Sequence, residues 1–239
     1  MTRDTTVGKQ TPAAPKVRVP GSQQAAHGIP LDRVYCAAQA DGSPLARGRT
    51  YKAEFTPDGA TYIPFCGSAA PRNHPLTFRI QGITSGGVQV AFADAVAAAR
   101  TGETVSYARG ALTELYALGV DSVEQKFVFE TLPASAELVL RLACTSDMSA
   151  SYSDGAIVFT SADGSVRYGA ATVVDADGAS APAQTQIVDG QIEIRVPADF
   201  LASAAFPITI DPVITTFEVF WGSDVPDDFA PSVAWDVTN

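Results

Sequence analysis

Apolar and polar residues alternate with a period of two through much of the chain after residue 33. In the run 137–144 every second residue is apolar, from Leu138 to Cys144, while Glu137 and Arg141 occupy the other side. The same alternation recurs over 127–129, 157–159, 166–168, 191–196 and 206–210. A period of two is typical of strands that pack on one face and meet water on the other.

Short turn signals separate these runs. The dipeptide Asp-Gly occurs six times, at 41–42, 58–59, 154–155, 163–164, 177–178 and 189–190. Asp-Gly suits tight hairpin turns because glycine reaches positive φ freely and aspartate tolerates it. Six such pairs beside alternating runs predict an antiparallel sheet.

The pattern predicts an all-β fold in which two antiparallel sheets stack into a sandwich, immunoglobulin-like or jelly-roll-like. One or two short helices accompany it. The alanine-rich segment 92–100, closed by Gly102, is one expected helix, and 197–202, opened by Pro197, is the other.

Composition divides the chain into three segments. Residues 1–30 are rich in Pro, Gln, Ala, Thr and Gly and are expected to be an extended leader or linker. Residues 31–214 form the predicted sandwich body, with a split into two β subdomains near 100–104 left open. Residues 215–239 are interpreted as an extra strand and the truncated start of a repeat region.

A long β-prone run with few charges, 213–221, comes after the Asp-Pro pair at 211–212. Such a run can pair with a sheet edge of its own chain or of another copy. The candidate strand-pairing residues are Thr215, Phe217, Val219 and Trp221.

Charge narrows the classes of partner. The chain has 239 residues and a net charge of −10, which argues against nucleic acid as the main partner. Ten Lys/Arg against five Asp/Glu give residues 1–80 a charge of +5, and six against twenty-one give residues 81–239 a charge of −15. This asymmetry suggests either an electrostatic contact, within the chain or between copies, or a flexible basic tail. No run of 18 apolar residues predicts a membrane span, and no signal peptide is visible.

The three cysteines offer one candidate disulfide. Cys36 and Cys66 both lie in or next to expected strands, and a bridge between them is a hypothesis. Cys144 ends an alternating run and is interpreted as a core residue. Without a Cys-x-x-Cys pair, and with His27 and His74 as the only histidines, the sequence argues against a structural zinc site.

Catalytic motifs are scarce, and we expect a protein that is not an enzyme. There is no Gly-x-Ser-x-Gly elbow, phosphate-binding glycine loop or His-Glu-x-x-His. Glu114 and Glu124 lie on successive expected strands, 112–118 and 123–131, and could face each other as a glycosidase pair. The alternative is a structural role for both carboxylates.

Two kinds of ligand remain open. The acidic C-terminal residues Asp224, Asp227 and Asp228 are candidate Ca²⁺ ligands, with solvated linker charge as the alternative. The run 175–178 resembles the start of a calcium loop but lacks its later ligands, so a hairpin turn explains it. Aromatic residues that could stack on a glycan, or fill the core instead, are Tyr51, Tyr62, Tyr107, Tyr116, Tyr152, Trp221 and Trp235. No cofactor is expected apart from this Ca²⁺.

Residues 105–214 resemble a bacterial extracellular module, frequent in large planctomycete and myxobacterial secreted proteins, that precedes FG-GAP-like or other β-propeller repeats. The resemblance lies in the blocks 107–110, 112–116, 123–127, 138–142, 174–178 and 206–214. The last block, Phe-Pro-Ile-Thr-Ile-Asp-Pro-Val-Ile, is the most specific. The resemblance implies a β-sandwich in a secreted or cell-surface protein and carries over no catalytic residues.

We therefore expect a structural or adhesive module that positions downstream repeats or self-associates by strand pairing. Its partners would be neighbouring domains or copies of the same protein. The alternatives are a lectin-like sandwich that binds carbohydrate with Ca²⁺, and a glycoside hydrolase that uses Glu114 and Glu124.

Overall fold

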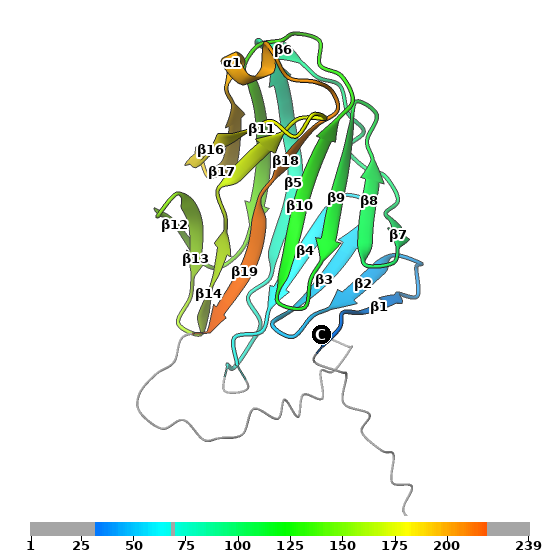
Figure 1. Ribbon diagram of the computed structural model, residues 1–239. Coiled ribbons are helices and arrows are strands. Elements are labelled where there is room, and N and C mark those ends of the chain that lie inside the picture. Colours follow the sequence, from blue (N-terminus) through cyan, green and yellow to red (C-terminus); the bar gives the residue numbers. More distant parts are fainter. Residues whose placement is uncertain (1–31, 68–69, 219–239) are drawn as a thin grey trace, which may run out of the picture.

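The protein is an all-β sandwich. The computed structural model describes residues 32–67 and 70–218, which form nineteen strands and one four-residue helix (Figure 1). Every strand pairing within this part of the chain is antiparallel. The fold class predicted from the alternating pattern is confirmed.

The first sheet contains the N-terminal strands and three later ones. Its order is β1 (Tyr35–Ala38), β2 (Pro44–Arg47), β3 (Tyr51–Thr56), β4 (Gly59–Pro64), β5 (Leu76–Ser85), β11 (Leu138–Thr145), β17 (Gln191–Val196) and β16 (Ser180–Val188). The short β6 (Val88–Gln89) pairs with the end of β5.

The second sheet begins with β7 (Ala99–Thr101), β8 (Thr104–Ala108), β9 (Leu112–Leu118) and β10 (Ser122–Phe129). Its next line is β18 (Ile208–Asp211) continued by β19 (Val213–Glu218), and beyond it lie β15 (Ala171–Val174) and β14 (Gly164–Tyr168). The line closes with β13 (Ala156–Thr160) and β12 (Ser149–Ser153). Strands β18 and β19 keep one register along β10 although Pro212 interrupts them, because Gln125 N–H still donates to the Pro212 carbonyl at 3.0 Å.

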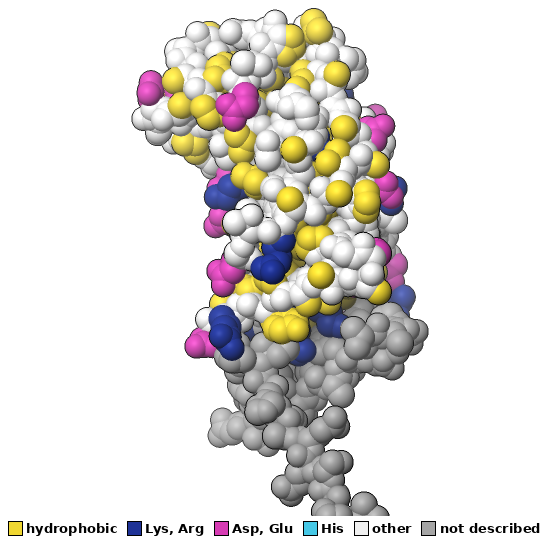
Figure 2. Space-filling view, turned by 90° about the vertical axis from the view of Figure 1, so that its right-hand side faces the viewer, with side chains coloured by type: hydrophobic (Ala, Val, Ile, Leu, Met, Phe, Trp, Pro, Cys, Tyr) yellow, Lys and Arg dark blue, Asp and Glu magenta, His cyan; other side chains and the backbone are white. Residues whose placement is uncertain are grey.

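Strand β16 belongs to both sheets. Its first half pairs with β15 of the second sheet, up to Ala183 opposite Ala171, and its second half pairs with β17 of the first, from Gln184 opposite Arg195. The sandwich is therefore joined by backbone hydrogen bonds along this side. On the opposite side lie the edge strands β1 and β7, and Figure 2 shows that apolar side chains there are dispersed among polar ones.

The interior is filled by the inward residues of both sheets. Leu138, Leu140 and Leu142 of β11 are each 0% exposed, as the alternating pattern requires. Aromatic rings from the two sheets pack together, for example Phe78 with Tyr168, whose ring centroids are 5.6 Å apart. Burial of this apolar area is the main favourable term for such a fold.

All six Asp-Gly pairs lie at hairpin turns between consecutive strands, as predicted. In the β12–β13 turn both residues have positive φ, 50° at Asp154 and 75° at Gly155. At Gly59 the requirement is space, since a Cβ there would collide with the carbonyl oxygen of Phe78 in β5.

One of the two expected helices is present. Helix α1 (Ala198–Leu201) begins directly after Pro197. The prediction of a helix over 92–100 is wrong, because this segment is irregular and ends in β7. Within the described residues, no helix has the length and apolar character needed to span a membrane.

Two of the divisions considered from the sequence fall on paired strands. The hairpin of β7 and β8 spans 100–104, with Thr101 paired to Thr104, so no division falls there. A boundary at 214/215 would cut β19, whose residues pair with β10 on one side and β14 on the other. Thr215 and Phe217 therefore lie in a strand paired within the chain, whereas the leader 1–30, Val219 and Trp221 lie outside the described residues.

Candidate functional site

An ion pair lies inside the sandwich, on the inner side of the second sheet. Glu114 of β9 shares its face with Leu112 and Tyr116 and is 1% exposed. Arg109, in the turn between β8 and β9, is also 1% exposed and donates from Nε to Glu114 Oε2 at 2.8 Å. Because water cannot solvate these charges, each needs the other and further hydrogen bonds.

The remaining carboxylate oxygen has two donors. Tyr116 donates its hydroxyl to Glu114 Oε1 at 2.6 Å, and Gln125 Nε2 of β10 lies 3.1 Å from the same oxygen. Tyr168 of β14 donates to Gln125 Oε1 at 2.8 Å. Burial, with the charge of Glu114, raises the pKa of Tyr116 and Tyr168 well above the usual value, so both hydroxyls stay protonated as donors.

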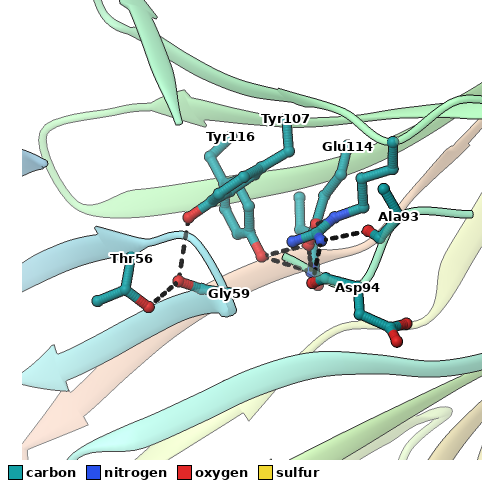
Figure 3. Close-up of polar contacts among 9 residues, drawn as sticks. Thr56, Gly59, Ala93, Asp94, Tyr107, Glu114 and Tyr116 are labelled. Carbon is teal, nitrogen blue, oxygen red and sulfur yellow. Dashed lines mark hydrogen bonds and ion pairs between the residues drawn. The ribbon is translucent and has the colours of Figure 1, made fainter. Parts of the chain in front are cut away.

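The guanidinium of Arg109 extends the network to the loop before β7. Its Nη1 donates to the carbonyl oxygens of Ala93 and Asp94 at 2.9 and 2.7 Å (Figure 3). The guanidinium carbon also lies 4.6 Å from the centroid of the Tyr107 ring. The Tyr107 hydroxyl donates across the sandwich to the carbonyl of Gly59 at 3.0 Å (Figure 3). This buried polar network, Arg109–Glu114–Tyr116–Gln125–Tyr168 with Tyr107, thus links both sheets and one loop.

The hydrogen bonding of the buried polar network is that of a structural ion pair. Nearly every polar atom has a partner in the described residues; the exception is Arg109 Nη2. The nearby cavity lined by Phe55, Tyr116, Val123 and Ile214 has a volume of about 10 Å³ and an apolar wall. A cavity of this size holds about one water molecule, so it offers no room for a substrate.

The proposed catalytic pair is not formed. Glu114 points into the core, whereas Glu124 lies on the other face of β10, 42% exposed and 2.8 Å from Lys126 Nζ. The two carboxylates sit on opposite faces of the second sheet because β10 places Glu124 one residue out of step with its buried residues Val123 and Gln125. The hydrolase hypothesis built on this pair is therefore wrong.

A second polar cluster joins three turns at one end of the sandwich. His74, before β5, is 4% exposed and lies between two carboxylates: Nδ1 is 2.9 Å from Asp147 and Nε2 is 2.7 Å from Asp163. Arg72 Nη1 contacts the other oxygen of Asp147 at 2.6 Å. Both ring nitrogens can donate to a carboxylate at once only in the protonated ring, so the geometry favours the imidazolium.

This cluster predicts a pH-dependent stability. Burial opposes charging of His74, but its hydrogen bonds to Asp163 and Asp147 outweigh burial and raise its pKa above the usual value. A raised folded-state pKa gives stability that is complete below pH 6.5 and is lost as the pH rises through the folded pKa, by at most about 1.4 kcal/mol per pH unit. Urea unfolding midpoints measured from pH 5 to 9 should fall over that window.

A His74→Gln variant should remove this pH dependence. Glutamine keeps one hydrogen bond to the carboxylates but does not titrate. If the variant and the parent lose stability in parallel between pH 6 and 9, the assignment to His74 fails.

The cysteines do not form the proposed bridge. All three are thiols, and no disulfide joins Cys36 to Cys66. Strands β2 and β3 lie between β1 and β4, and Cys66 lies just past the end of β4, so about 14 Å separates β1 from β4 at the usual strand spacing. A disulfide needs Cα atoms within about 7 Å. Burial raises the pKa of the Cys144 thiol to about 12.

The proposed ligand residues fall into three groups. Four of the candidate aromatics fill the core: Tyr51, Tyr62, Tyr107 and Tyr116 are at most 2% exposed. Tyr152 is 60% exposed. The remaining candidates lie outside the described residues: Asp224, Asp227, Asp228, Trp221 and Trp235. Within the described ranges, no three His, Cys, Asp or Glu side chains are grouped so as to hold a metal ion.

The calcium-like run at 175–178 is a turn. Asp175 Oδ1 accepts the N–H groups of Asp177 and Ala179 at 3.0 and 2.8 Å, and Oδ2 accepts that of Ala205 at 3.0 Å. These backbone hydrogen bonds, that of Ala205 first, lower the pKa of Asp175. Its carboxylate fixes the β15–β16 hairpin against the segment after α1.

Sequence reasoning missed Arg109 and Gln125. A signal existed: Glu114 is in step with Leu112, Tyr116 and Leu118, so the alternation already placed a carboxylate on the apolar face. A buried carboxylate requires a cation, and Arg109 is the nearest one in sequence.

Comparison with known proteins adds no relative. No protein-family model matches the chain, and a search of curated proteins finds no significant match.

Proposed function

We propose that this chain is a non-enzymatic structural module of a secreted or cell-surface protein, which holds the segments that flank it and contacts neighbouring domains or copies. The observation that carries the proposal is the position of β19. This last described strand is an inner strand of the second sheet, hydrogen-bonded to β10 on one side and β14 on the other.

The packing of β19 supports a role as an anchor. Ile214 is 1% exposed in the core, and the Thr216 hydroxyl lies 2.7 Å from the Tyr62 hydroxyl of the first sheet. A force applied to the chain after residue 218 must therefore open two ladders and one contact between the sheets before the strand is released. Such an attachment suits a module that holds the adjoining C-terminal segment in place.

The ends of the described chain support the same role. Strand β1 begins and β19 ends at the lower end of the sandwich in Figure 1. At this end the Arg49 and Asp121 side chains form an ion pair between the β2–β3 and β9–β10 turns, and the Tyr51 hydroxyl donates to the Gly119 carbonyl at 2.8 Å. The flanking segments thus attach to an end where the two sheets are tied together.

The resemblance to modules that precede propeller repeats supports the extracellular setting. Its most specific block, 206–214, contains β18, Pro212 and the start of β19. The block that marks the resemblance is therefore the one that leads into the proposed anchor.

Hydrogen exchange on the full chain tests the anchor. The amides of 214–218 should exchange as slowly as those of β18, because both lie inside the second sheet. Amides on the unpaired side of the edge strand β7 serve as the fast-exchanging control. Exchange of 214–218 at the rate of this control would overturn the proposal.

A further inference from the structure

Strand β12 is an open edge of the second sheet. Within the described part of the chain it pairs only with β13, and all five of its residues are exposed (Figure 1). Its sequence, Ser-Ala-Ser-Tyr-Ser, contains no charge and no proline. Natural sheets usually protect an edge of this kind with a charge, a proline or a cover.

The turn after β12 fixes which backbone groups point outward. Ser153 and Ala156 flank the two-residue turn Asp154–Gly155, so they form a hydrogen-bonded pair. Hydrogen bonding then alternates along the strand. The N–H and C=O groups of Ser149, Ser151 and Ser153 face β13, and those of Ala150 and Tyr152 face away from the sheet.

The edge strands β7 and β16 carry protection of this kind. Strand β7 contains Arg100, a charged residue whose side chain donates to the Gly102 carbonyl at 2.8 Å. Strand β16 contains Pro182 and turns from one sheet into the other. Strand β19, the pairing segment expected from the sequence, has both of its edges occupied.

We propose that β12 pairs antiparallel with β12 of a second copy of this chain, about a two-fold axis at Ser151. This names the partner surface for the proposed structural module and rests on that function. In this register Ala150 of one copy lies opposite Tyr152 of the other, so two pairs exchange four backbone hydrogen bonds.

The strand is complementary to itself. Each large Tyr152 meets a small Ala150, and Ser149 meets Ser153. No charged residue faces another across the five pairs, which matters between two chains of net charge −10. Beyond the strand, Asp154 of one copy lies opposite Met148 of the other. Met148 follows Asp147, which forms an ion pair with Arg72, a side chain that is 64% exposed. The Asp154 carboxylate therefore faces a turn that carries a cation.

The expected affinity is low. Five paired residues bury less than the roughly 1,200 Å² of a standard interface, so we expect dissociation constants of about 100 μM or weaker. Copies displayed together on a surface would pair more strongly because their effective concentration is high.

Disulfide trapping tests the register. Across the two-fold axis, residues 151 of the two copies form a non-hydrogen-bonded pair with Cα atoms about 4.5 Å apart, within the range of a disulfide. Residue 149 of one copy lies about 13 Å from residue 149 of the other. Under mild oxidation at high protein concentration, Ser151→Cys should form covalent dimers and Ser149→Cys should not.

The unmodified chain gives the background from its own three cysteines. Equal dimer yields from the two variants, or none above background from Ser151→Cys, would overturn the proposed pairing.

Sedimentation from 10 μM to 1 mM provides a second measurement. Ala150→Lys places a charge opposite Tyr152 and should weaken self-association at least tenfold. Ala95→Lys adds the same charge at an exposed residue of the loop before β7 and should leave self-association unchanged. A monomer throughout this range, or an equal effect of both substitutions, would overturn the proposal. Slow exchange of 214–218 in the same samples would show that the anchor stands even if the pairing fails.

Discussion

Replacing Glu114 with glutamine is expected to lower the free energy of unfolding by about 3–5 kcal/mol. The substitution keeps the size of the side chain but leaves Arg109 as a buried cation without a counter-charge, 1% exposed. Its remaining partners are the carbonyls of Ala93 and Asp94, at 2.9 and 2.7 Å, and the ring of Tyr107, none of which carries a full charge. At about 2–4 °C per kcal/mol, the unfolding temperature should fall by roughly 6–20 °C.

Glu124→Gln is the matched control. Glu124 lies on the neighbouring strand and also pairs with a cation, Lys126 at 2.8 Å, but its side chain is 42% exposed. Exposed pairs contribute about 0–1 kcal/mol, so urea unfolding of this variant should nearly match that of the parent. Similar losses in the two variants would contradict the special role of the buried pair.

Ending the chain after Pro212 is expected to abolish folding, whereas ending it after Glu218 is expected to preserve it. The first truncation removes all of β19 and opens a gap between β10 and β14, which loses two ladders. It also removes Ile214, 1% exposed, from the core. Unpaired backbone groups at two new edges add to the loss and favour aggregation.

Circular dichroism and light scattering compare the two truncated chains. The chain ending at Glu218 should unfold cooperatively near the temperature of the full chain. If the chain ending at Pro212 does the same, β19 adds little to the fold and the anchor proposal loses its basis.

Much of this architecture was predictable from local signals. An Asp-Gly pair specifies a tight turn through its own backbone preferences, so each of the six could be placed without knowledge of the rest of the fold. The alternating runs likewise fixed which residues of β11 and β17 face the core. The order of the strands in each sheet, such as β11 beside β5, depends on packing between distant segments, which no local pattern encodes.

The segment 92–100 shows how tertiary contacts override a local preference. Its alanines favour a helix. However, Arg109 donates to the carbonyls of Ala93 and Asp94, which a helix would need for its own hydrogen bonds. The N–H of Val96 donates to the Pro57 carbonyl at 2.9 Å. A buried guanidinium without these acceptors would be strongly unfavourable, so the loop is held open instead.

The polar interior was predictable only in part. The alternation from Leu112 to Leu118 predicts that the Glu114 side chain faces the core. The positions of Gln125 and Tyr168 around it depend on the pairing of β9 with β10, β10 with β19, and β19 with β14. The cluster around His74 joins turns 73 and 89 residues apart in sequence, and only the folded chain brings them together.

The inner position of β19 also affects how the protein is made. Strand β10 leaves the ribosome about 90 residues before β19, because Phe129 and Glu218 bound the interval. At a synthesis rate of about 5–20 residues per second, β19 follows β10 after roughly 5–20 s, and it follows β14 after a shorter time. During this interval the nascent sheet exposes two uncovered edges. We therefore expect synthesis of this protein to depend on a chaperone, or on slow release, that keeps these edges apart from other chains until β19 arrives.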